Sequence, residues 1–495
     1  MTDNEPSKKE KFRQETKEER RTRFKERRRQ KAESKLVGFR QSTNYIDSAL
    51  TSESIYYIDS QSPKLRKVYP YFFTWITYAK ERWYGRTIED VFQYEFRRAI
   101  LKQNFDDLVR NGLVRINGQC IEKNYIMKNG DKLEHFTHRH EVPVINQKLN
   151  ILINNEDYLV IDKPCSIPVH PCGKYRFNTV LAILHYDYQL SNLRTVHRLD
   201  RMTSGILIMA KSAEKARAID FNADRLSNNG VNKLYLCRVR GEFPYINQIV
   251  RVDQPIETFS FQLGLTKIGG NKQCQTLFRR VTYEELKQQQ EIHGKFIFDL
   301  TNETNENIET KIDESLYKYL DQDERKTSLV LCRPLSGRMH QIRVHLQYLG
   351  FPIVNDPLYN APDIWGPSNG QYGQYEHSNE YVIETFIKRH SCEYWLLNDI
   401  DNDDETININ GKRIMEQDEE HINDDVKRIK TEEITTIDVN DENAVKAYIK
   451  EHCFECLNRF REPSPDDLVM FLHALQYKIS DVTTFTSSLP EWAQI

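Results

Sequence analysis

The sequence predicts an α+β protein built around a mixed, mainly antiparallel β-sheet. Residues 151–360 contain apolar runs of strand length, namely YLVIDKP, GILIMAKS, KLYLCRVRGEF and TSLVLCRPL, with helix-like stretches between them. The runs do not alternate regularly with helices, and no glycine-rich phosphate-binding loop accompanies them. Both observations argue against a doubly wound parallel sheet.

Composition and charge indicate an intracellular protein with polar additions to its globular part. The chain has 495 residues, 29% of them charged, and a mean hydropathy of −0.69, which is more polar than a compact domain needs. Its nine cysteines have scattered spacing, so we expect reduced thiols. No apolar run reaches the length of a membrane span. The acidic residues among the N-terminal bases disfavour a mitochondrial transit peptide, so we expect a cytoplasmic or nuclear location.

The first 140 residues divide into a basic arm and a small folded domain. Residues 1–40 contain KKEKFRQETKEERRTRFKERRRQK, which has almost nothing to bury, and we expect a disordered arm that attracts phosphates or directs nuclear import. Residues 65–142 begin with an aromatic-rich segment. From Phe105 the pattern predicts a helix ending at Asn111-Gly112, the strand LVRI, a tight turn at Asn117-Gly118 and a further strand. This pattern resembles the S4-type RNA-binding fold, and an ordinary helix–hairpin unit is the alternative.

The remainder of the chain is expected to form one main domain with polar interruptions. This domain spans residues 150–395, and the Gln-, Asn- and Glu-rich segment at 271–326 is predicted to be an insertion in a surface loop. Residues 398–441 are strongly acidic and predict a solvated linker. Residues 442–495 are expected to be helical and to pack on the main domain. Within them PSPDDLVMFLHALQYK has the spacing of a capped amphipathic helix.

A single acid, Asp200, is the first candidate for chemistry. It lies between arginines in HRLDRMTSGILIMAKS, just before a small-residue turn and an apolar run. An aspartate that only binds the backbone of its turn is the ordinary alternative. Neighbouring guanidinium groups favour the ionised carboxylate, which is the form that a nucleophile needs. The absence of a second acid nearby in the sequence argues against a paired glycosidase site.

A second candidate is the segment GRMHQIRVHL at residues 337–346. Arg338, His340, Arg343 and His345 concentrate positive charge and hydrogen-bonding capacity there. Such a segment can hold phosphates, or Arg343 can reach a carboxylate with both prongs of its guanidinium. A solvent-facing strand or helix edge is the alternative.

Four motifs in one order carry a resemblance to a known family. The HRLDRMTSGILIMAK motif at 197–211 resembles the active-site motif of the RluA-type RNA pseudouridine synthases. DKPCSIPVHP, NKLYLCRVRG and GRMHQIRVHLQYLGFPIVNDPLY are similar to three further elements of that family. The RKVYPYFF, HRHEVPV and PSPDDLVMFLHALQY stretches resemble its eukaryotic branch, whose members modify tRNA or mRNA.

The resemblance, which spans about residues 65–359, implies a pseudouridine synthase fold, a reaction and roles for particular residues. It makes Asp200 the catalytic carboxylate, whether by attack on the ribose, attack on the base or removal of the 2′ proton. Tyr235 would stack on the uracil or accept the C5 proton, and Arg343 would pair with Asp200. Arg198 would fill the space of the flipped-out base, with Arg338 and His340 contacting RNA. The reaction requires no cofactor.

Two groups of possible metal ligands are each incomplete in the sequence. His135, His138 and His140 lie in EHFTHRHE, where the last two alternate along a predicted strand with no cysteine beside them. Cys453 and Cys456 form a single C-x-x-C without a second pair. A zinc site needs four ligands, so we expect packed thiols and no metal.

The sequence therefore predicts a monomeric enzyme that isomerises uridines in RNA, with tRNA the first candidate substrate and mRNA the second, and with no membrane partner. An RNA-binding or chaperone protein without turnover is the alternative from another class. Asp200, Tyr235 and Arg343 argue against it, because a binding protein does not need all three. An aspartate-nucleophile hydrolase is disfavoured because a metal-binding acid cluster is missing from the sequence.

Overall fold

The computed structural model divides into two compact units, which we describe separately. One consists of Met1–Ile55, Tyr69–His140 and Gly411–Leu457, and the other of Tyr56–Val68, Glu141–Asn410 and Asn458–Ile495. None of the described helices has the length and hydropathy to cross a membrane. The structure describes residues 55–96, 105–219, 231–244, 249–261, 263–297, 326–389, 438–439, 441–458, 462–479 and 483–494.

The larger unit is built on a ten-stranded sheet with the strand order β13-β16-β17-β12-β18-β11-β9-β8, in which β10 pairs with β11 and β19 with β18. All of its pairs are antiparallel except β11 with β18, which are parallel. The predicted α+β class and mixed, mainly antiparallel sheet are confirmed. The strands are β8 (Asn150–Asn154), β9 (Tyr158–Lys163), β10 (Arg194–Thr195), β11 (Ser204–Ala210), β12 (Val231–Arg240), β13 (Ile249–Asp253), β16 (Gln275–Val281), β17 (Thr327–Pro334), β18 (Leu472–Ile479) and β19 (Thr483–Thr486).

Apolar side chains cover both faces of this sheet. On one face Cys237 and Val330 pack with Ile342 and Leu346 of α8 (Gln341–Tyr348). The residues next to Cys237 and Val330 along the same strands point to the other face. There they pack in a second core with α7 (Tyr283–His293) and the short helix η8 (Glu491–Ala493). Successive strand residues point to opposite faces, so strands buried on both sides read as continuous apolar runs in the sequence.

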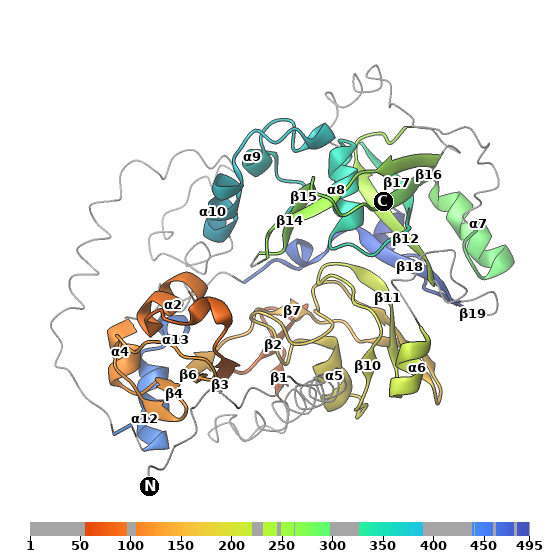
Figure 1. The fold of residues 1–495 in the computed structure, drawn as a ribbon. Helices are drawn as coiled ribbons and strands as arrows, with labels where there is room; N and C mark the ends of the chain where they lie inside the picture. The colour runs from red at the N-terminus through yellow and green to blue at the C-terminus, as the bar shows by residue number, and fades with distance from the viewer. Residues whose placement is uncertain are drawn as a thin grey trace, which may run out of the picture. The chain divides into compact units, whose positions relative to one another are not determined.

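Smaller elements surround this sheet. The hairpin of β14 (Ile256–Ser260) and β15 (Leu265–Ile268) lies beside α9 (Pro362–Trp365) and α10 (Asn379–Arg389), and shares a core with them (Figure 1). The other elements of this unit are the three-stranded sheet of β1 (Tyr56–Tyr57), β2 (Leu65–Val68) and β7 (Val144–Ile145), the helices α5 (Val180–Tyr186) and α6 (Ala213–Ala218), and the short helices η4 (Gln371–Gly373) and η7 (Pro465–Leu468).

The predicted amphipathic helix in PSPDDLVMFLHALQYK is wrong. Ser464 does form a capping box, but the helix is the short 3-10 turn η7, and the chain then enters β18. β18 pairs with β11 and β12 on its two edges, and its consecutive residues from Leu472 to Leu475 are all buried, so both of its faces are covered. A strand buried on both faces shows no alternation of polar and apolar residues, and its apolar residues can satisfy a helical spacing by chance.

The predicted insertion at 271–326 is also wrong in its first part. Residues 275–281 form β16, which pairs with both β13 and β17. Helix α7 follows, capped by the Thr282 side chain and ended by Gly294 in the left-handed conformation. The polar composition belongs to exposed helix positions there. Residues 298–325, the basic arm at 1–40 and almost all of the acidic linker lie outside the described residues.

The smaller unit has a four-stranded sheet in the order β3-β6-β4-β5, with β3 (Tyr71–Tyr78), β4 (Val114–Ile116), β5 (Gln119–Cys120) and β6 (Lys132–Arg139). Its other elements are η2 (Glu81–Trp83), α2 (Ile88–Glu95) and α4 (Phe105–Arg110). The predicted helix, strand, turn and second strand are confirmed here. Asn117 and Gly118 have φ values of 55° and 81°, as a tight hairpin turn requires.

Two later helices, α12 (Glu442–Glu451) and α13 (Phe454–Leu457), also belong to this smaller unit. The Asp441 side chain caps α12 by accepting hydrogen bonds from two backbone N–H groups. Val445 and Ile449 then enter the core formed by α2, α4 and β4. The prediction that residues 442–495 form one helical segment on the main domain is therefore corrected, because their apolar faces join two different cores.

Gly205 is the point where β11 approaches β18 most closely. Its φ is +103°, and a Cβ atom there would lie 2.6 Å from the Ala474 backbone nitrogen and closer still to the Ala474 carbonyl oxygen. Only glycine fits this position without moving one strand. The glycine of the TSG sequence after Asp200 is thus required by the sheet.

We expect Gly205→Ala to lower the free energy of unfolding by about 3 kcal/mol or more, because it adds a backbone clash to an unfavourable φ. Gly294→Ala is the matched control, since Gly294 also has positive φ but open space around its Cβ position. The control should cost only about 1 kcal/mol. Urea unfolding of both variants measures the difference, and equal losses would contradict the close-contact argument.

Candidate active site

The loop that carries Asp200 is fixed at both ends. The Thr203 N–H donates to the Asp200 carbonyl oxygen at 3.1 Å, which closes a turn. His197 Nε2 accepts the Ile208 N–H of β11 at 3.1 Å, and burial lowers the pKa of His197 to about 3, so the ring stays neutral and can accept. Leu199 and Met202 are buried on either side of Asp200. The turn therefore holds Asp200 while its side chain stays 22% exposed.

A buried lysine at the end of β9 also holds the loop that carries Asp200. Lys163 Nζ donates to the carbonyl oxygens of Pro164, Ile167 and Arg201, at 2.8, 2.9 and 3.2 Å. Burial lowers the pKa of Lys163 to about 8. The lysine thus connects the DKPCSIPVHP segment to the residue after Asp200. The positioning role of Lys163 could not be predicted from the DKPCSIPVHP motif alone, because it depends on contact with a separate loop.

Asp200 faces two side chains of the GRMHQIR segment. Its Oδ2 lies 3.5 Å from Arg343 Nη1 and 3.5 Å from His340 Nε2. Burial acts to raise the pKa of Asp200, but the charges of its basic neighbours, Arg343 among them, outweigh burial and lower it. The carboxylate is therefore ionised at neutral pH.

The two-pronged contact expected between Arg343 and Asp200 is made to Asp356 instead. Arg343 Nε and Nη2 donate to Asp356 Oδ2 and Oδ1 at 2.8 and 2.7 Å. Asp356 Oδ1 also accepts the N–H groups of Leu358 and Tyr359. Arg343 is only 4% exposed, and its remaining nitrogen, Nη1, points to Asp200. Sequence reasoning missed Asp356, although it lies within the quoted motif as the acid before a proline.

His340 begins helix α8 in the left-handed conformation, with φ of 57°. Its Nδ1 lies 2.9 Å from the Tyr359 hydroxyl, which itself accepts the Thr266 N–H. Burial lowers the pKa of His340 to about 4, so the ring is neutral at pH 7. Because Nε2 faces the Asp200 carboxylate, which can only accept, the neutral ring is expected to carry its proton on Nε2, and Nδ1 then accepts from the Tyr359 hydroxyl. His340 thus belongs beside the carboxylate, whereas the sequence analysis placed it among RNA-contacting residues.

Tyr235 on β12 is held by a second tyrosine. Its hydroxyl lies 2.7 Å from the hydroxyl of Tyr477 on β18, and the two rings meet edge to face at 5.9 Å. Burial raises the pKa of Tyr235 to about 12, and the charge of Asp200 adds to that effect. The phenol is therefore neutral at physiological pH. Sequence reasoning could not find Tyr477, because it assigned that segment to a helix.

Comparison with known proteins agrees with this geometry. A family model described as "RNA pseudouridylate synthase" matches residues 157–348. Pseudouridylate synthase RPUSD2 from Homo sapiens is 35% identical over 90% of this chain and 75% of its own length. The chain belongs to the RNA pseudouridylate synthase family. It is of the RluA type, and the enzyme is an isomerase that forms pseudouridine within RNA.

Two further relatives from Saccharomyces cerevisiae extend the match. The mitochondrial tRNA pseudouridine(32) synthase is 30% identical over 87% of this chain and 77% of its own length. The tRNA pseudouridine(31) synthase is 29% identical over 87% of this chain and 96% of its own length. Both matches extend well beyond the residues that the family model covers.

The remaining predicted site residues lie at the surface of the synthase. Arg198 is exposed, and burial raises the pKa of Asp200 while the positive charge of Arg198 helps to lower it. Arg338 is exposed, and its backbone N–H donates to the Gln341 side chain at the start of α8. Within the described residues of this unit, no three His, Cys, Asp or Glu side chains converge as metal ligands would.

Replacing Arg343 should destabilise the synthase in a pH-dependent way. Arg343→Met leaves Asp356 buried without its cation, which we expect to cost about 3–5 kcal/mol at neutral pH. Burial acts to raise the pKa of Asp356, but Arg343 lowers it. The stability that this ion pair gives the folded protein is therefore present above the unfolded-state pKa of about 3.9 and is lost as pH falls below it.

The difference in unfolding free energy between wild type and Arg343→Met should therefore be full at neutral pH and should narrow mainly as pH falls below about 4, through the lowered pKa of Asp356. Arg343→Lys, which keeps the charge but not the planar fork, should lose less. Denaturant unfolding at several pH values measures both variants. A difference that does not change with pH would contradict the ion pair.

Proposed function

We propose that this synthase modifies a uridine of tRNA at or beside position 32. The two yeast relatives whose names specify positions 31 and 32 of tRNA each match 87% of the chain. Their matches include the smaller unit as well as the catalytic unit. The proposal for tRNA rests on these relatives, and mRNA is the alternative substrate.

We assign the catalytic role to Asp200. The reaction breaks the bond from uracil N1 to ribose C1′, turns the base and forms a bond from C5 to C1′, while a proton leaves C5 and N1 gains one. The reaction is an isomerisation, so it needs no oxidant or other reactant. It does need an ionised carboxylate in a site that keeps the detached base from escaping. The ionised state of Asp200 beside Arg343, in a largely buried turn, supplies the carboxylate.

Tyr235 is assigned to stacking on the uracil. Its phenol has a pKa of about 12 because of burial, so the phenolate that would act directly as a base is scarce at neutral pH. Stacking by a neutral ring requires no ionisation. The hydrogen bond to Tyr477 fixes the orientation of the ring. These observations favour stacking over proton transfer at C5.

Arg198 is assigned to the space that the flipped base leaves in the RNA. The base must leave its stack before Asp200 can reach it, at a cost of about a few kcal/mol. Arg198 is exposed and only two residues from Asp200, and these two facts support the assignment of its planar guanidinium to that space.

The smaller unit is assigned to RNA binding as an S4-like module. Its helix α4, the hairpin of β4 and β5, and strand β6 follow the order of that fold. Trp75 on β3 is 43% exposed, and the Arg139 guanidinium lies 4.8 Å from its ring centroid. An exposed aromatic ring beside an arginine is a suitable surface for stacking an unpaired base.

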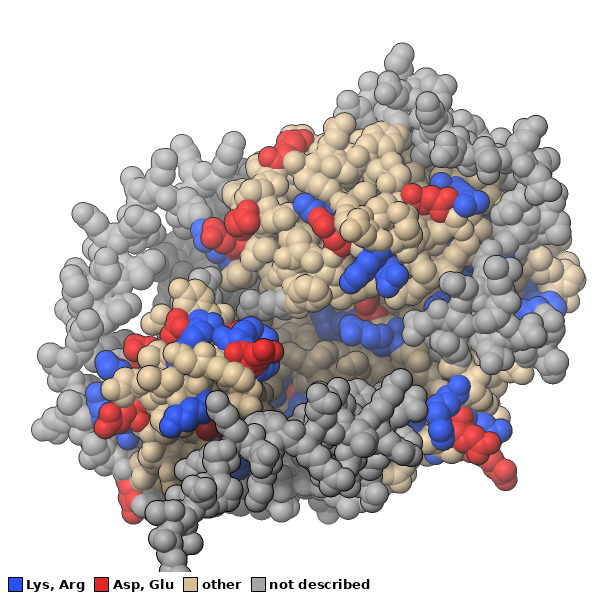
Figure 2. Space-filling view, in the orientation of Figure 1, with Lys and Arg blue, Asp and Glu red and all other residues tan. Residues whose placement is uncertain are grey.

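Charge is distributed in small groups on the described surface. In the face shown in Figure 2, many lysine and arginine side chains lie near aspartates and glutamates, some near the middle of the view have little acidic surface beside them, and much of the surface between the charged groups is uncharged. Individual contacts, rather than one broad basic surface on this face, would therefore position the RNA.

The decisive experiment incubates the purified synthase with an unmodified tRNA transcript and maps pseudouridine at each position. We expect product at or beside position 32 with wild type and none with Asp200→Asn, because the amide cannot supply a carboxylate. RNA affinity of the variant should remain within about a few-fold of wild type, since phosphate contacts provide most of it.

A matched mRNA-derived hairpin tests the alternative substrate in the same assay. Product only in the mRNA hairpin would reject the tRNA proposal while retaining the enzyme. Wild-type turnover by Asp200→Asn would instead remove Asp200 from the catalytic role.

Trp75→Ala should weaken binding of tRNA by about five- to one-hundred-fold, the range expected for loss of one stacked base. Ile76→Ala is the control, because Ile76 is 56% exposed on the other face of the same strand. Fluorescence anisotropy with labelled tRNA measures both affinities. Equal effects of the two substitutions would show that the Trp75 face does not contact RNA.

A further inference from the structure

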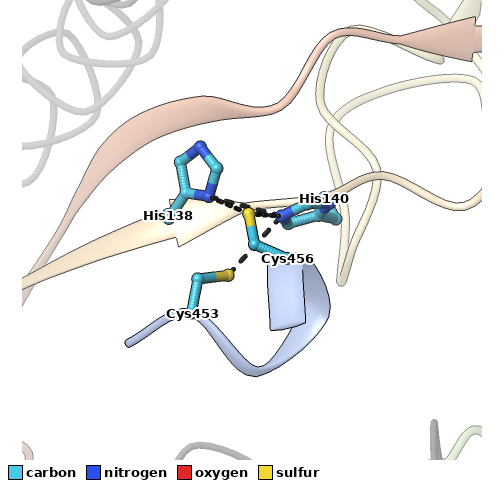
Figure 3. Close-up of side chains that lie close together, drawn as sticks. All are labelled: His138, His140, Cys453 and Cys456. Carbon is cyan, nitrogen blue, oxygen red and sulfur yellow. Dashed lines mark hydrogen bonds between the residues drawn. The ribbon is translucent and has the colours of Figure 1, made fainter. Parts of the chain in front are cut away.

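The smaller unit contains a cluster of two histidines and two cysteines from distant parts of the chain. His138 and His140 are two residues apart at the end of β6, so both side chains point to the same side of the strand. Cys453 and Cys456 lie where α12 ends and α13 begins. Figure 3 shows the four side chains pointing toward one another from these two elements.

The ligand atoms of the cluster are close enough to share one ion. His138 Nδ1 and His140 Nε2 are 3.3 Å apart, and Cys456 Sγ lies 3.3 Å from each of them. Cys453 Sγ is 3.5 Å from His140 Nε2. All four atoms lie within 4.8 Å of one another. Among the described residues of the chain, no other group of His, Cys, Asp and Glu converges in this way.

These separations match a tetrahedral zinc site. With Zn–N bonds of about 2.05 Å and Zn–S bonds of about 2.3 Å, a tetrahedron places two nitrogens about 3.3 Å apart and a nitrogen and a sulfur about 3.6 Å apart. The nitrogen–nitrogen separation of 3.3 Å equals the first value, and the nitrogen–sulfur separations of 3.3 and 3.5 Å lie slightly below the second. Two imidazoles and two thiolates are a ligand set that zinc prefers.

The environment of the sulfurs also suits a metal. The Cys456 N–H donates to the Cys453 carbonyl oxygen at 2.9 Å, which closes the turn between the two cysteines, and their sulfurs lie within 4.8 Å of each other. The ring of Phe72 lies 5.0 Å from that of His138 and limits its rotation. Cys453 is buried, whereas Cys456 is exposed, so an ion can enter from one side.

We infer that His138, His140, Cys453 and Cys456 bind a structural zinc ion. All four positions of the tetrahedron are filled by protein, as in structural rather than catalytic zinc sites. In the sequence no cysteine lies beside the two histidines, but in the fold the two cysteines do. The two incomplete pairs together therefore supply four ligands. His135 takes no part, since its ring lies in the core against Phe92.

The zinc ion would attach α12 and α13 to β6. Cys453 and His140 are 313 residues apart in the sequence, so the ion joins a returning segment to the sheet of the smaller unit. Closing so long a loop costs conformational entropy, which metal coordination can offset. Val445 and Ile449 already bury one face of α12 in the core, and the zinc site would fix its far end.

The test measures metal in the full-length protein, purified under reducing conditions from zinc-supplemented cells. Elemental analysis should find about one zinc ion per chain in wild type and under about one tenth in the Cys453→Ser, Cys456→Ser double variant. Cys120→Ser is the matched control, because Cys120 is an exposed cysteine of the same unit outside the cluster, and it should keep the zinc.

Cobalt substitution of the wild type gives a readout that does not depend on a variant folding. Cobalt(II) should produce the visible bands of tetrahedral coordination and a thiolate charge-transfer band. Cys456→His should retain one metal ion but lose about half of that charge-transfer intensity, since one of two thiolates is gone. Reduced wild type without zinc and without tetrahedral cobalt bands would overturn the proposal, as would a double variant that retains full zinc.

Discussion

The site depends on one buried guanidinium shared by two carboxylates. Arg343 gives two of its nitrogens to Asp356 and directs the third to Asp200. A buried cation needs a full anionic partner, and Asp356 meets that need without using Asp200. Asp200 therefore receives a positive charge at 3.5 Å while its oxygens stay available to a substrate. Asp356 thus stabilises the buried Arg343, and Asp200 is left for chemistry.

Much of this site could be predicted from the sequence because its residues lie in short motifs. Asp200, Tyr235 and Arg343 occur in three such motifs, and the structure brings them into one unit. Lys163 and Tyr477 could not be assigned because their roles come from contacts with other motifs. Asp356 lies 13 residues after Arg343 in the same motif, but only the fold shows that the two side chains pair. Lys163 serves three carbonyl oxygens, and no sequence pattern marks a lysine that binds backbone groups.

The errors in the predicted fold have a common physical cause. The spacing of apolar residues along a segment shows which one face of a helix or strand is buried. It does not predict the structure correctly where both faces are buried, and it does not show which distant segment shares the core. β18 is buried on both sides, so the spacing of its apolar residues predicts a helix, whereas α12 joins a core built from residues more than 300 positions earlier. The histidine pair and the cysteine pair are also distant in the sequence and meet only in the fold. Neither pair alone is a complete set of metal ligands.

The position of β18 between β11 and β12 also determines when activity can arise during synthesis. β11 follows Asp200 and β12 carries Tyr235, but the two strands do not pair with each other and are joined only through β18. Residues 204–240 therefore leave the ribosome long before residues 472–479, which complete the sheet between them. A nascent chain that already contains every catalytic motif would still be inactive, so RNA modification would begin only after synthesis has passed this strand.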